Sequence, residues 1–324
     1  MTLENAIKLV NGAKVASHLF GDDPKKRYHE LALLLHPDRV KGNPKAALAF
    51  AKLSSMYAEL TAPAPATVIG KWRIDSVCAT GEICDLYYTM DASERAVFKI
   101  VRNESDNDLV ENEWAHLRML HGDKHTDNFK KYLPRPIEAL EASGRRANVL
   151  SLAKDALSLT DILSITAYPN GLPFRHIVWM ANRAFSALSF VHSCGIVHGA
   201  VLPEHLMFGP VNHGFALVDW CYSVTGESKA HIPAIVKDRE QHYPSEVKKK
   251  KPATPATDIY MLASVLMESA QEIPRRFKSL FEWCMASSPH SRPGDAWKVR
   301  DRLLDLAREQ YGEPSYVKLE IPVS

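Results

Sequence analysis

The chain has 324 residues, 46% of them hydrophobic and 24% charged, which is enough apolar material for two or three compact units with their own cores. The formal net charge of +2 gives no reason to expect a nucleic-acid partner, since proteins that bind nucleic acid present a strong basic field. No stretch of about 18 apolar residues is present and no secretory signal opens the chain, so we expect a cytoplasmic protein without a membrane partner.

Cysteine usage agrees with a reducing compartment. The cysteines form no C-x-x-C pair and no spacing typical of a zinc site: Cys78, Cys84, Cys194, Cys221 and Cys284. We expect all of them to be free thiols, which is the default in the cytosol.

Apolar residues with helical spacing predict two helices near the start of the chain. The first has one apolar face, made by Tyr28, Leu31, Ala32 and Leu35, and it ends at His36-Pro37-Asp38 because proline stops a helix. The second follows the Gly42-Asn43-Pro44 turn and has its own apolar face: Phe50, Leu53, Tyr57 and Leu60. A shorter, earlier helix is expected loosely within Leu3 to Val10, and no structure is assigned to the segment from Asn11 to Asp23.

Two antiparallel helices closed by a His-Pro-Asp loop resemble a J domain. In that family the tripeptide and the basic outer surface of the preceding helix engage a DnaK-type chaperone ATPase and stimulate its ATP hydrolysis. The resemblance therefore assigns chaperone binding to these residues: His36, Pro37, Asp38, Lys25, Lys26, Arg27 and Arg39. For the tripeptide alone, an ordinary helix-ending turn is the alternative.

An alternating Pro/Ala stretch from Thr61 to Thr67 follows the second helix. Such a composition favours a semi-extended spacer over a helix, with a rise of about 3.1 Å per residue. We interpret it as a linker that holds the helical unit beside the next part of the chain.

Short motifs of a second kind begin beyond residue 70. The segment Ala79 to Leu86 aligns with a glycine-rich loop but keeps only its middle glycine, Gly81. The segment Ala96 to Ile100 is β-branched and aromatic, as in a strand, and it contains Lys99. Glu113 then lies in a helical pattern, with leucines four and seven residues later.

Further motifs continue toward the carboxyl terminus. A helical stripe that stops at Gly195 is formed by Ile177, Met180, Ala184, Leu188 and Val191. After it come His198-Gly199-Ala200, with His205 close behind, and Asp219-Trp220-Cys221. The last motifs are Pro244-Ser245-Glu246, Asp258-Ile259-Tyr260 and Arg292-Pro293.

In this order and spacing, the motifs resemble those of a protein kinase from about residue 70 to about residue 310. The resemblance implies that Lys99 would touch the nucleotide phosphates and pair with Glu113, and that Asp219 would hold Mg²⁺. It also implies a structural ion pair between Glu246 and Arg292.

The catalytic groups of that family are missing from this chain. Ala200 replaces the Asp that accepts or orients the proton of the attacking hydroxyl, and His205 replaces the Asn that holds a magnesium ion. Because a methyl group cannot accept a proton, no general base is available at this position. We therefore predict no catalytic residues and a pseudokinase that is not an enzyme.

Nucleotide binding is left open, with ATP and Mg²⁺ as the candidate cofactors and four candidate residues: Gly81, Lys99, Glu113 and Asp219. Glu82 and Asp85 place negative charge near the expected phosphates, which opposes binding. An equally weighted alternative is that the charged members of this set form a relic salt-bridge cluster. His198, His205 and Asp219 also admit a zinc or manganese site, although a packed core histidine is the commoner role for His198.

The predicted fold class is α+β, with a small all-α J domain followed by a bilobal kinase-like domain. The predicted divisions are a J domain over 1–60, a linker over 61–69, a mostly β amino-terminal lobe over 70–153, a mostly α carboxyl-terminal lobe over 154–312 and a tail over 313–324. The predicted function is a co-chaperone adaptor that stimulates a DnaK-type ATPase, while the pseudokinase domain binds an unknown client or partner protein. The alternative is an atypical ATP-dependent kinase or transferase that uses Lys99, Glu113 and Asp219.

Overall fold

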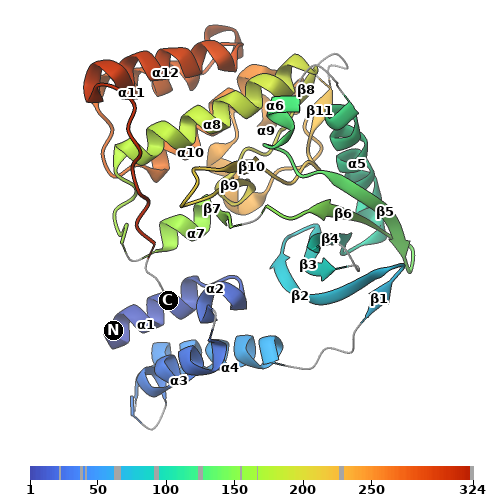
Figure 1. The fold of residues 1–324 in the computed structure, drawn as a ribbon, viewed down its shortest axis with the longest axis vertical. Coiled ribbons are helices and arrows are strands. Elements are labelled where there is room, and N and C mark those ends of the chain that lie inside the picture. Colours follow the sequence, from blue (N-terminus) through green and yellow to red (C-terminus); the bar gives the residue numbers. More distant parts are fainter. Residues whose placement is uncertain are drawn as a thin grey trace. The chain divides into compact units, whose positions relative to one another are not determined.

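A computed structural model describes residues 1–21, 23–36, 39–40, 42–61, 67–90, 95–122, 127–153, 155–165, 167–225 and 230–321 (Figure 1). The chain divides into two compact units. The first comprises Met1–Glu104 and Leu140–Val149, and the second comprises Ser105–Ala139 and Leu150–Pro322. The division predicted from sequence, with its linker and two lobes, stays a prediction.

The first unit begins with a group of helices. They are α1 (Leu3–Gly12), α2 (Ala16–Phe20), α3 (Pro24–Leu35) and α4 (Pro44–Thr61). The Thr2 hydroxyl accepts from the Asn5 amide at 3.4 Å, and the Asp23 carboxylate accepts from the Lys26 amide at 3.0 Å. Proline starts both α3 and α4, where its missing N–H costs no helical hydrogen bond.

These helices bury one apolar cluster, because α1 packs on both α3 and α4. Leu31, Leu35 and Leu53 are fully buried in it, which confirms the two predicted helical faces. The rings of Tyr28 and Tyr57 stack across α3 and α4 with centroids 4.2 Å apart. The segment that had no assignment contains α2, which adds Leu19 and Phe20 to the same cluster.

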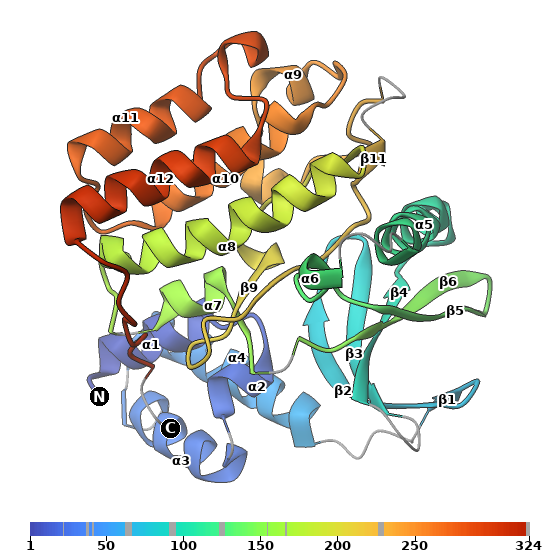
Figure 2. The same ribbon diagram turned by 45° about the horizontal axis from the view of Figure 1, so that its top comes forward.

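A six-stranded sheet follows, with the order β1-β2-β3-β4-β6-β5. Its strands are β1 (Val68–Ile69), β2 (Trp72–Thr80), β3 (Cys84–Met90), β4 (Arg95–Val101), β5 (Pro136–Ala142) and β6 (Arg145–Ser151). β3 lies between β2 and β4 and pairs antiparallel with both. The register of β2 on β3 shifts on either side of Val77, and β2 curves strongly there (Figure 2). Phe98 and Ile100 of β4 are buried, as its β-branched and aromatic composition indicates.

The second unit is mostly helical. Its helices are α5 (Asn107–Gly122), α6 (Asp127–Lys130), α7 (Leu159–Ser164), α8 (Phe174–Ser193), α9 (Ser245–Lys248), α10 (Pro255–Ser269), α11 (Arg275–Cys284) and α12 (Ala296–Tyr311). Helix α8 buries the predicted stripe and packs against α10 and α12 (Figure 2). It ends just before Gly195, whose φ of 75° is the left-handed conformation that ends many helices.

Short strands complete the second unit and position the loop between β8 and β9. They are β7 (Leu157–Ser158), β8 (Ile196–Val197), β9 (Leu206–Phe208), β10 (Phe215–Leu217) and β11 (Val224–Thr225). One small sheet has the order β10-β9-β7, and a second pairs β11 with β8. The sequence His198 to His205 therefore lies between two strands that belong to different small sheets.

Glu246 and Arg292, which were expected to pair, meet deep in the second unit. Arg292 reaches both carboxylate oxygens of Glu246, one of them at 3.2 Å from Nη2. Only 1% of the Arg292 side chain and 5% of the Glu246 side chain are exposed. The same guanidinium donates to the carbonyl of Ala286 at 2.6 Å and lies 4.6 Å from the centre of the Tyr260 ring. The two buried charges are thus paired with each other, and the guanidinium also donates to the carbonyls of Ala286 and Ser287.

Within the described ranges, no helix is long and apolar enough to cross a membrane. The five cysteines are free thiols, as expected.

Candidate functional site

One buried carboxylate, that of Asp258, fixes the backbone of the loop that carries Ala200. Asp258, in the first turn of α10, accepts from the backbone amides of His198 and Gly199, each at 2.8 Å. It also accepts from Nε2 of His192 at 2.8 Å and is completely buried. Ionised acceptors make strong hydrogen bonds in such surroundings, so Asp258 holds the loop backbone in one conformation.

Gly199 is a backbone requirement of this loop. Its φ is 77°, and a Cβ atom built there would lie 2.7 Å from the carbonyl oxygen of Tyr222. A larger residue therefore cannot take its place without a backbone shift.

His198 is a packed core histidine. Its side chain is fully buried, and both ring nitrogens are used: Nε2 donates to the carbonyl of Val218 at 3.2 Å, while Nδ1 accepts from the amide of Ala200 at 3.3 Å. Burial lowers the pKa of His198 to about 4, more than the nearby Asp258 and Asp219 charges can offset. The ring is therefore neutral at pH 7 and has no free nitrogen for a metal ion.

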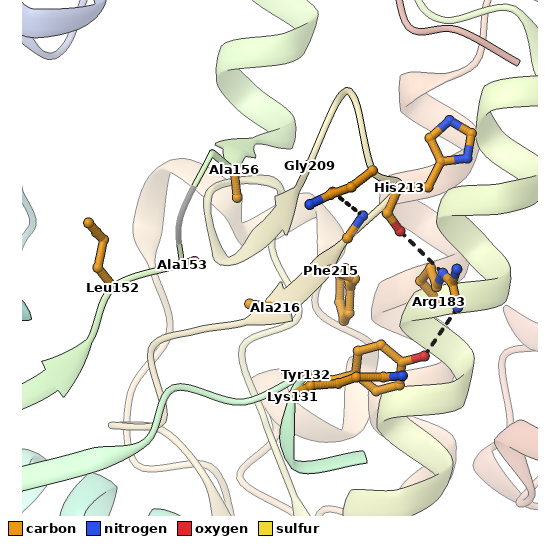
Figure 3. Close-up of a pocket in the computed structure, with 12 residues that line it drawn as sticks. Lys131, Tyr132, Leu152, Ala153, Ala156, Arg183, Gly209, His213, Phe215 and Ala216 are labelled. Carbon is orange, nitrogen blue, oxygen red and sulfur yellow. Dashed lines mark hydrogen bonds between the residues drawn. The ribbon is translucent and has the colours of Figure 1, made fainter. Parts of the chain in front are cut away.

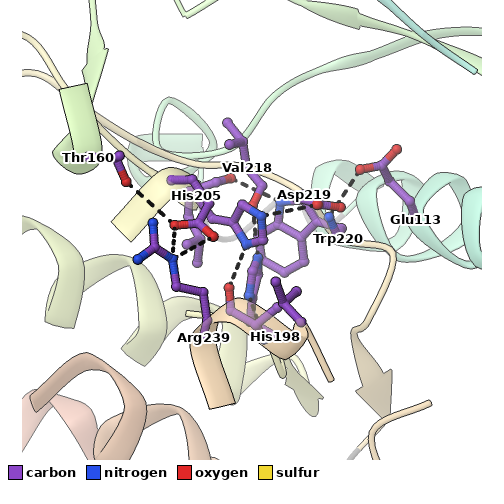
Figure 4. A network of polar contacts seen from close by, with 12 residues as sticks. Glu113, Thr160, His198, His205, Val218, Asp219, Trp220 and Arg239 are labelled. Atoms are coloured by element: carbon purple, nitrogen blue, oxygen red, sulfur yellow. Dashed lines mark hydrogen bonds and ion pairs between the residues drawn. The ribbon is translucent and has the colours of Figure 1, made fainter. Parts of the chain in front are cut away.

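His205 lies next to Asp219, and its pKa is shifted in the opposite direction from that of His198 (Figure 4). Its Nε2 is 3.2 Å from a carboxylate oxygen of Asp219, and its Nδ1 is 2.8 Å from the carbonyl of Ala200. Burial lowers the pKa of His205, but the Asp219 carboxylate, Glu204 and the Ala200 carbonyl together outweigh burial and leave it raised. Both ring nitrogens face acceptors, which only the doubly protonated, cationic imidazole can satisfy.

A second carboxylate supports this cation from the other side. Glu204 is held by Nε of Arg239, at 3.0 and 3.1 Å from its two oxygens, and Thr160 lies 3.5 Å from one of them. Burial raises the pKa of Glu204, yet the charges of His205 and Arg239 outweigh it and lower the pKa overall. Arg239 pairs with Glu204, the charges of Glu204 and His205 interact, and His205 pairs with Asp219, so four charges alternate in sign.

The segment Asp219-Trp220-Cys221 is fixed to helix α5. The Trp220 amide donates to a carboxylate oxygen of Glu113 at 3.0 Å, and its indole is fully buried against His198. Farther along, the side chain of Asn112 donates to the Ser223 carbonyl at 2.8 Å, and Nδ1 of His116 lies 2.7 Å from the Ser223 hydroxyl. Asp219 itself has a φ of 64°, an uncommon conformation for a residue with a side chain.

The donor set does not fit the two magnesium ions of kinase chemistry. His205 stands in place of the Asn that holds a magnesium ion, both of its ring nitrogens face acceptors, and its pKa is raised. Ligand atoms of Glu113, Asp219 and Cys221 do lie within 4.8 Å of one another, but Glu113 is engaged with the Trp220 amide. Mg²⁺ prefers oxygen ligands and keeps several waters, so a buried thiol in this set argues against it.

The loop around Gly81 belongs to the first unit. It is a short connection between β2 and β3, closed by a hydrogen bond from the Gly81 amide to the Cys84 carbonyl at 2.8 Å. Asp85 lies 3.7 Å from the guanidinium of Arg102, which also donates to the Gly81 carbonyl at 3.2 Å. Part of the negative charge that was expected to oppose a phosphate is therefore compensated by Arg102.

The remaining nucleotide candidates occupy separate units. Lys99 is buried on β4 in the first unit, and Glu113 is buried on α5 in the second. The Lys99–Glu113 ion pair and nucleotide binding both stay predictions.

In the helices of the first unit, the basic residues that are candidates for chaperone binding lie on the solvent side. Lys25 and Lys26 are exposed, and Arg27 pairs with Glu30 at 3.1 Å. Arg39 is exposed and reaches the Leu33 carbonyl at 3.4 Å, near the end of α3. Pro37 and Asp38 lie outside the described residues.

Sequence reasoning missed the roles of Glu204 and Arg239. Neither residue belongs to a short motif, and Arg239 is distant in sequence from the loop that it supports. The adjacent Glu204 and His205 offered the only local signal, a charge pair inside an otherwise apolar segment.

Comparisons with known proteins support the kinase-like fold. No protein-family model matches the chain, and no curated protein matches it. The solved structures similar to it include a mutant of the Mycobacterium tuberculosis PknI kinase domain, with a TM-score of 0.59 and 13% identity over 75% of this chain and 98% of that one. A double mutant of the same domain gives a TM-score of 0.56 and 14% identity, with the same coverage. Likeness at this identity shows the fold.

The predicted kinase-like fold is thus confirmed. The prediction that the chain is not an enzyme is contradicted, because the similar solved structures are kinase domains. The error came from taking the loss of one proton acceptor at Ala200 as the loss of all chemistry. In phosphoryl transfer, positioning and charge contribute most of the rate, so the absence of a base at position 200 does not by itself exclude catalysis.

Proposed function

We propose that the chain is a co-chaperone adaptor whose amino-terminal helices recruit a DnaK-type chaperone ATPase and whose kinase-like domain binds a client or partner protein. The observation that carries this proposal is the helical hairpin of α3 and α4, with α1 packed on both. The described part of the hairpin loop turns back on His36, whose carbonyl accepts from the amides of Arg39 and Val40 at 2.9 and 3.1 Å.

The surface of this hairpin supports the same proposal. The His36 ring packs edge-on against Phe50, with centroids 5.3 Å apart, so the end of α3 is tied to α4 beside the His-Pro-Asp sequence. Lys25, Lys26 and Arg39 expose positive charge on the solvent side of α3 and its loop. Exposed cations beside the end of α3 suit an acidic protein surface and fast, salt-dependent association.

Charge reversal on α3 tests this proposal by direct binding. We expect Lys25→Glu with Lys26→Glu to weaken binding to a DnaK-type ATPase domain by about tenfold or more at low salt, with a smaller difference at high salt. Binding is measured by biolayer interferometry across a salt series. The matched control is Lys8→Glu with Lys14→Glu, two exposed lysines outside α3 that give the same change in charge. Equal weakening by both pairs would reject a binding surface on α3.

A second candidate function is an atypical ATP-dependent phosphotransferase. The chain of charges from Arg239 to Asp219 favours it, because His205 supplies a fixed positive charge inside the loop that kinases use for catalysis. The bond formed joins the γ-phosphorus to an acceptor hydroxyl, and the bond broken releases ADP. In the loose transition state of this reaction the hydroxyl proton can leave to the transferred phosphoryl group or to water, so Ala200 does not forbid it.

Transfer of labelled phosphate from ATP measures this second function. We expect His205→Gln to lower the rate by about a hundredfold, because the glutamine keeps one hydrogen bond and removes the charge near the phosphoryl group. The control is His290→Gln, the same change at an exposed position. Lys99→Ala should also abolish transfer if its predicted phosphate contact exists. A rate that neither substitution at the site reduces would eliminate this function.

A further inference from the structure

A pocket of 430 Å³ lies in the second unit and shares no residue with the His205–Asp219 cluster (Figure 3). Its walls come from four places in the sequence. Leu152, Ala153 and Ala156 form an apolar side of the pocket. The turn from Gly209 to Ala216 forms a second side, which includes polar residues. Lys131 and Tyr132 follow α6, and Arg183 projects from α8. Volumes of this size are typical of small-molecule sites.

Two cationic side chains, Arg183 and Lys131, line the pocket. Nε of Arg183 donates to the carbonyl of His213 at 3.2 Å, and a terminal nitrogen lies 3.4 Å from the Tyr132 hydroxyl, so both of its partners are neutral. The ammonium group of Lys131 lies 5.4 Å from the centre of the Tyr132 ring. In the part of the chain that the structure describes, no carboxylate lines the pocket or pairs with either cation. Arg183 is partly buried and Lys131 is exposed, so an anion that binds both gains most at Arg183.

Arg183 is held in place before any ligand arrives. His213, whose carbonyl it contacts, is stacked on Trp179 with ring centroids 4.0 Å apart, and its Nε2 donates to the Val317 carbonyl at 2.9 Å. The Asn212 carboxamide accepts from the Gly214 amide at 2.7 Å and folds over Gly209, where any Cβ atom would overlap it. A guanidinium fixed in this way loses little conformational freedom on binding.

The wall opposite these cations is apolar, since it consists of Leu152, Ala153 and Ala156, with the Phe215 ring at the base of the turn (Figure 3). The geometry points to a binding site for a small organic anion, with an apolar body against these side chains and a carboxylate or phosphate head on Arg183 and Lys131. A free inorganic anion would leave the apolar wall uncovered.

Calorimetric titration of the full chain with phenyl phosphate and phenylacetate tests this site, with benzyl alcohol as the neutral probe of similar shape. We expect at least one anion to bind with one site per chain, and the neutral probe not to bind. The head group preferred then identifies the ligand as a phosphate ester or a carboxylate.

Two substitutions test whether the anion binds in this pocket. Lys131→Gln and Arg183→Gln should each weaken it by about tenfold, which is the usual size of a lost charge-assisted hydrogen bond. Lys131 is exposed, so its variant should fold even if the Arg183 variant does not. Lys298→Gln, an exposed lysine on α12, is the control and should leave the affinity unchanged. Absence of binding by either anion, equal binding of benzyl alcohol, or an affinity that Lys131→Gln does not change would overturn the assignment.

Discussion

Replacing Glu246 with glutamine is expected to destabilise the second unit by about 3–5 kcal/mol. The substitution keeps the shape of the side chain but leaves the Arg292 guanidinium buried beside a neutral amide. Only 1% of the Arg292 side chain is exposed, so water cannot replace the lost charge. Its contacts with Ala286 and Ser287 remain, but these carbonyls do not carry the compensating negative charge.

Hydrogen exchange of the α10 amides is the suitable readout, because α10 lies in the second unit and carries Tyr260, on which Arg292 stacks. The control is Glu309→Gln, which removes the ion pair between Arg276 and Glu309, where about half of each side chain is exposed. An exposed pair of this kind contributes about 0–1 kcal/mol. Similar losses in the two variants would show that burial does not set the strength of the Glu246 pair.

Acid is expected to destabilise the protein through His198 before most carboxylates titrate. Burial lowers the pKa of His198 to about 4, so the unfolded chain binds this proton near pH 6.5 while the folded chain does not. The unfolded state therefore gains the proton first, and stability falls as the pH drops from about 6.5 to about 4. The expected loss from this one residue is roughly 3 kcal/mol.

Comparison with His198→Gln isolates that contribution, since glutamine can donate to the Val218 carbonyl and does not titrate. The difference in unfolding free energy between the two proteins should shrink by roughly 3 kcal/mol on going from pH 7 to pH 4. His205→Gln provides a control of opposite sign. Because the pKa of His205 is raised, its contribution is present below about pH 6.5 and is lost as the pH rises through the folded value. A difference for His198→Gln that stays constant with pH would show that the ring is not buried as neutral imidazole.

Much of the helical unit could be predicted from local patterns. The faces around Leu31 and Leu53 have helical periodicity, and Pro24 and Pro44 stand where helices commonly begin. Helix α2 could not be predicted, because five residues give too short a period to recognise. Its burial of Leu19 and Phe20 depends on contacts with helices elsewhere in the sequence.

The kinase-like site was predictable only in part, because it too depends on contacts between segments that are distant in the sequence. Motif order predicted that Glu246 and Arg292 would pair, and their side chains meet in the second unit. Spacing alone could not show that the pKa of His205 is raised, since that shift depends on Asp219 and Glu204 around it. Nor could it show that Gly199 is required by the Tyr222 carbonyl, which approaches from a different segment.

Steady-state ATP hydrolysis by a DnaK-type chaperone, with and without this protein, tests the proposed co-chaperone role most directly. We expect stimulation by the natural chain and its loss in Asp38→Asn, which changes the carboxylate of the His-Pro-Asp sequence and none of the residues of the buried helical cluster. Hydrolysis by this protein alone is measured in parallel and subtracted. Stimulation that persists in Asp38→Asn, or no stimulation by the natural chain, would contradict a co-chaperone role for the amino-terminal helices.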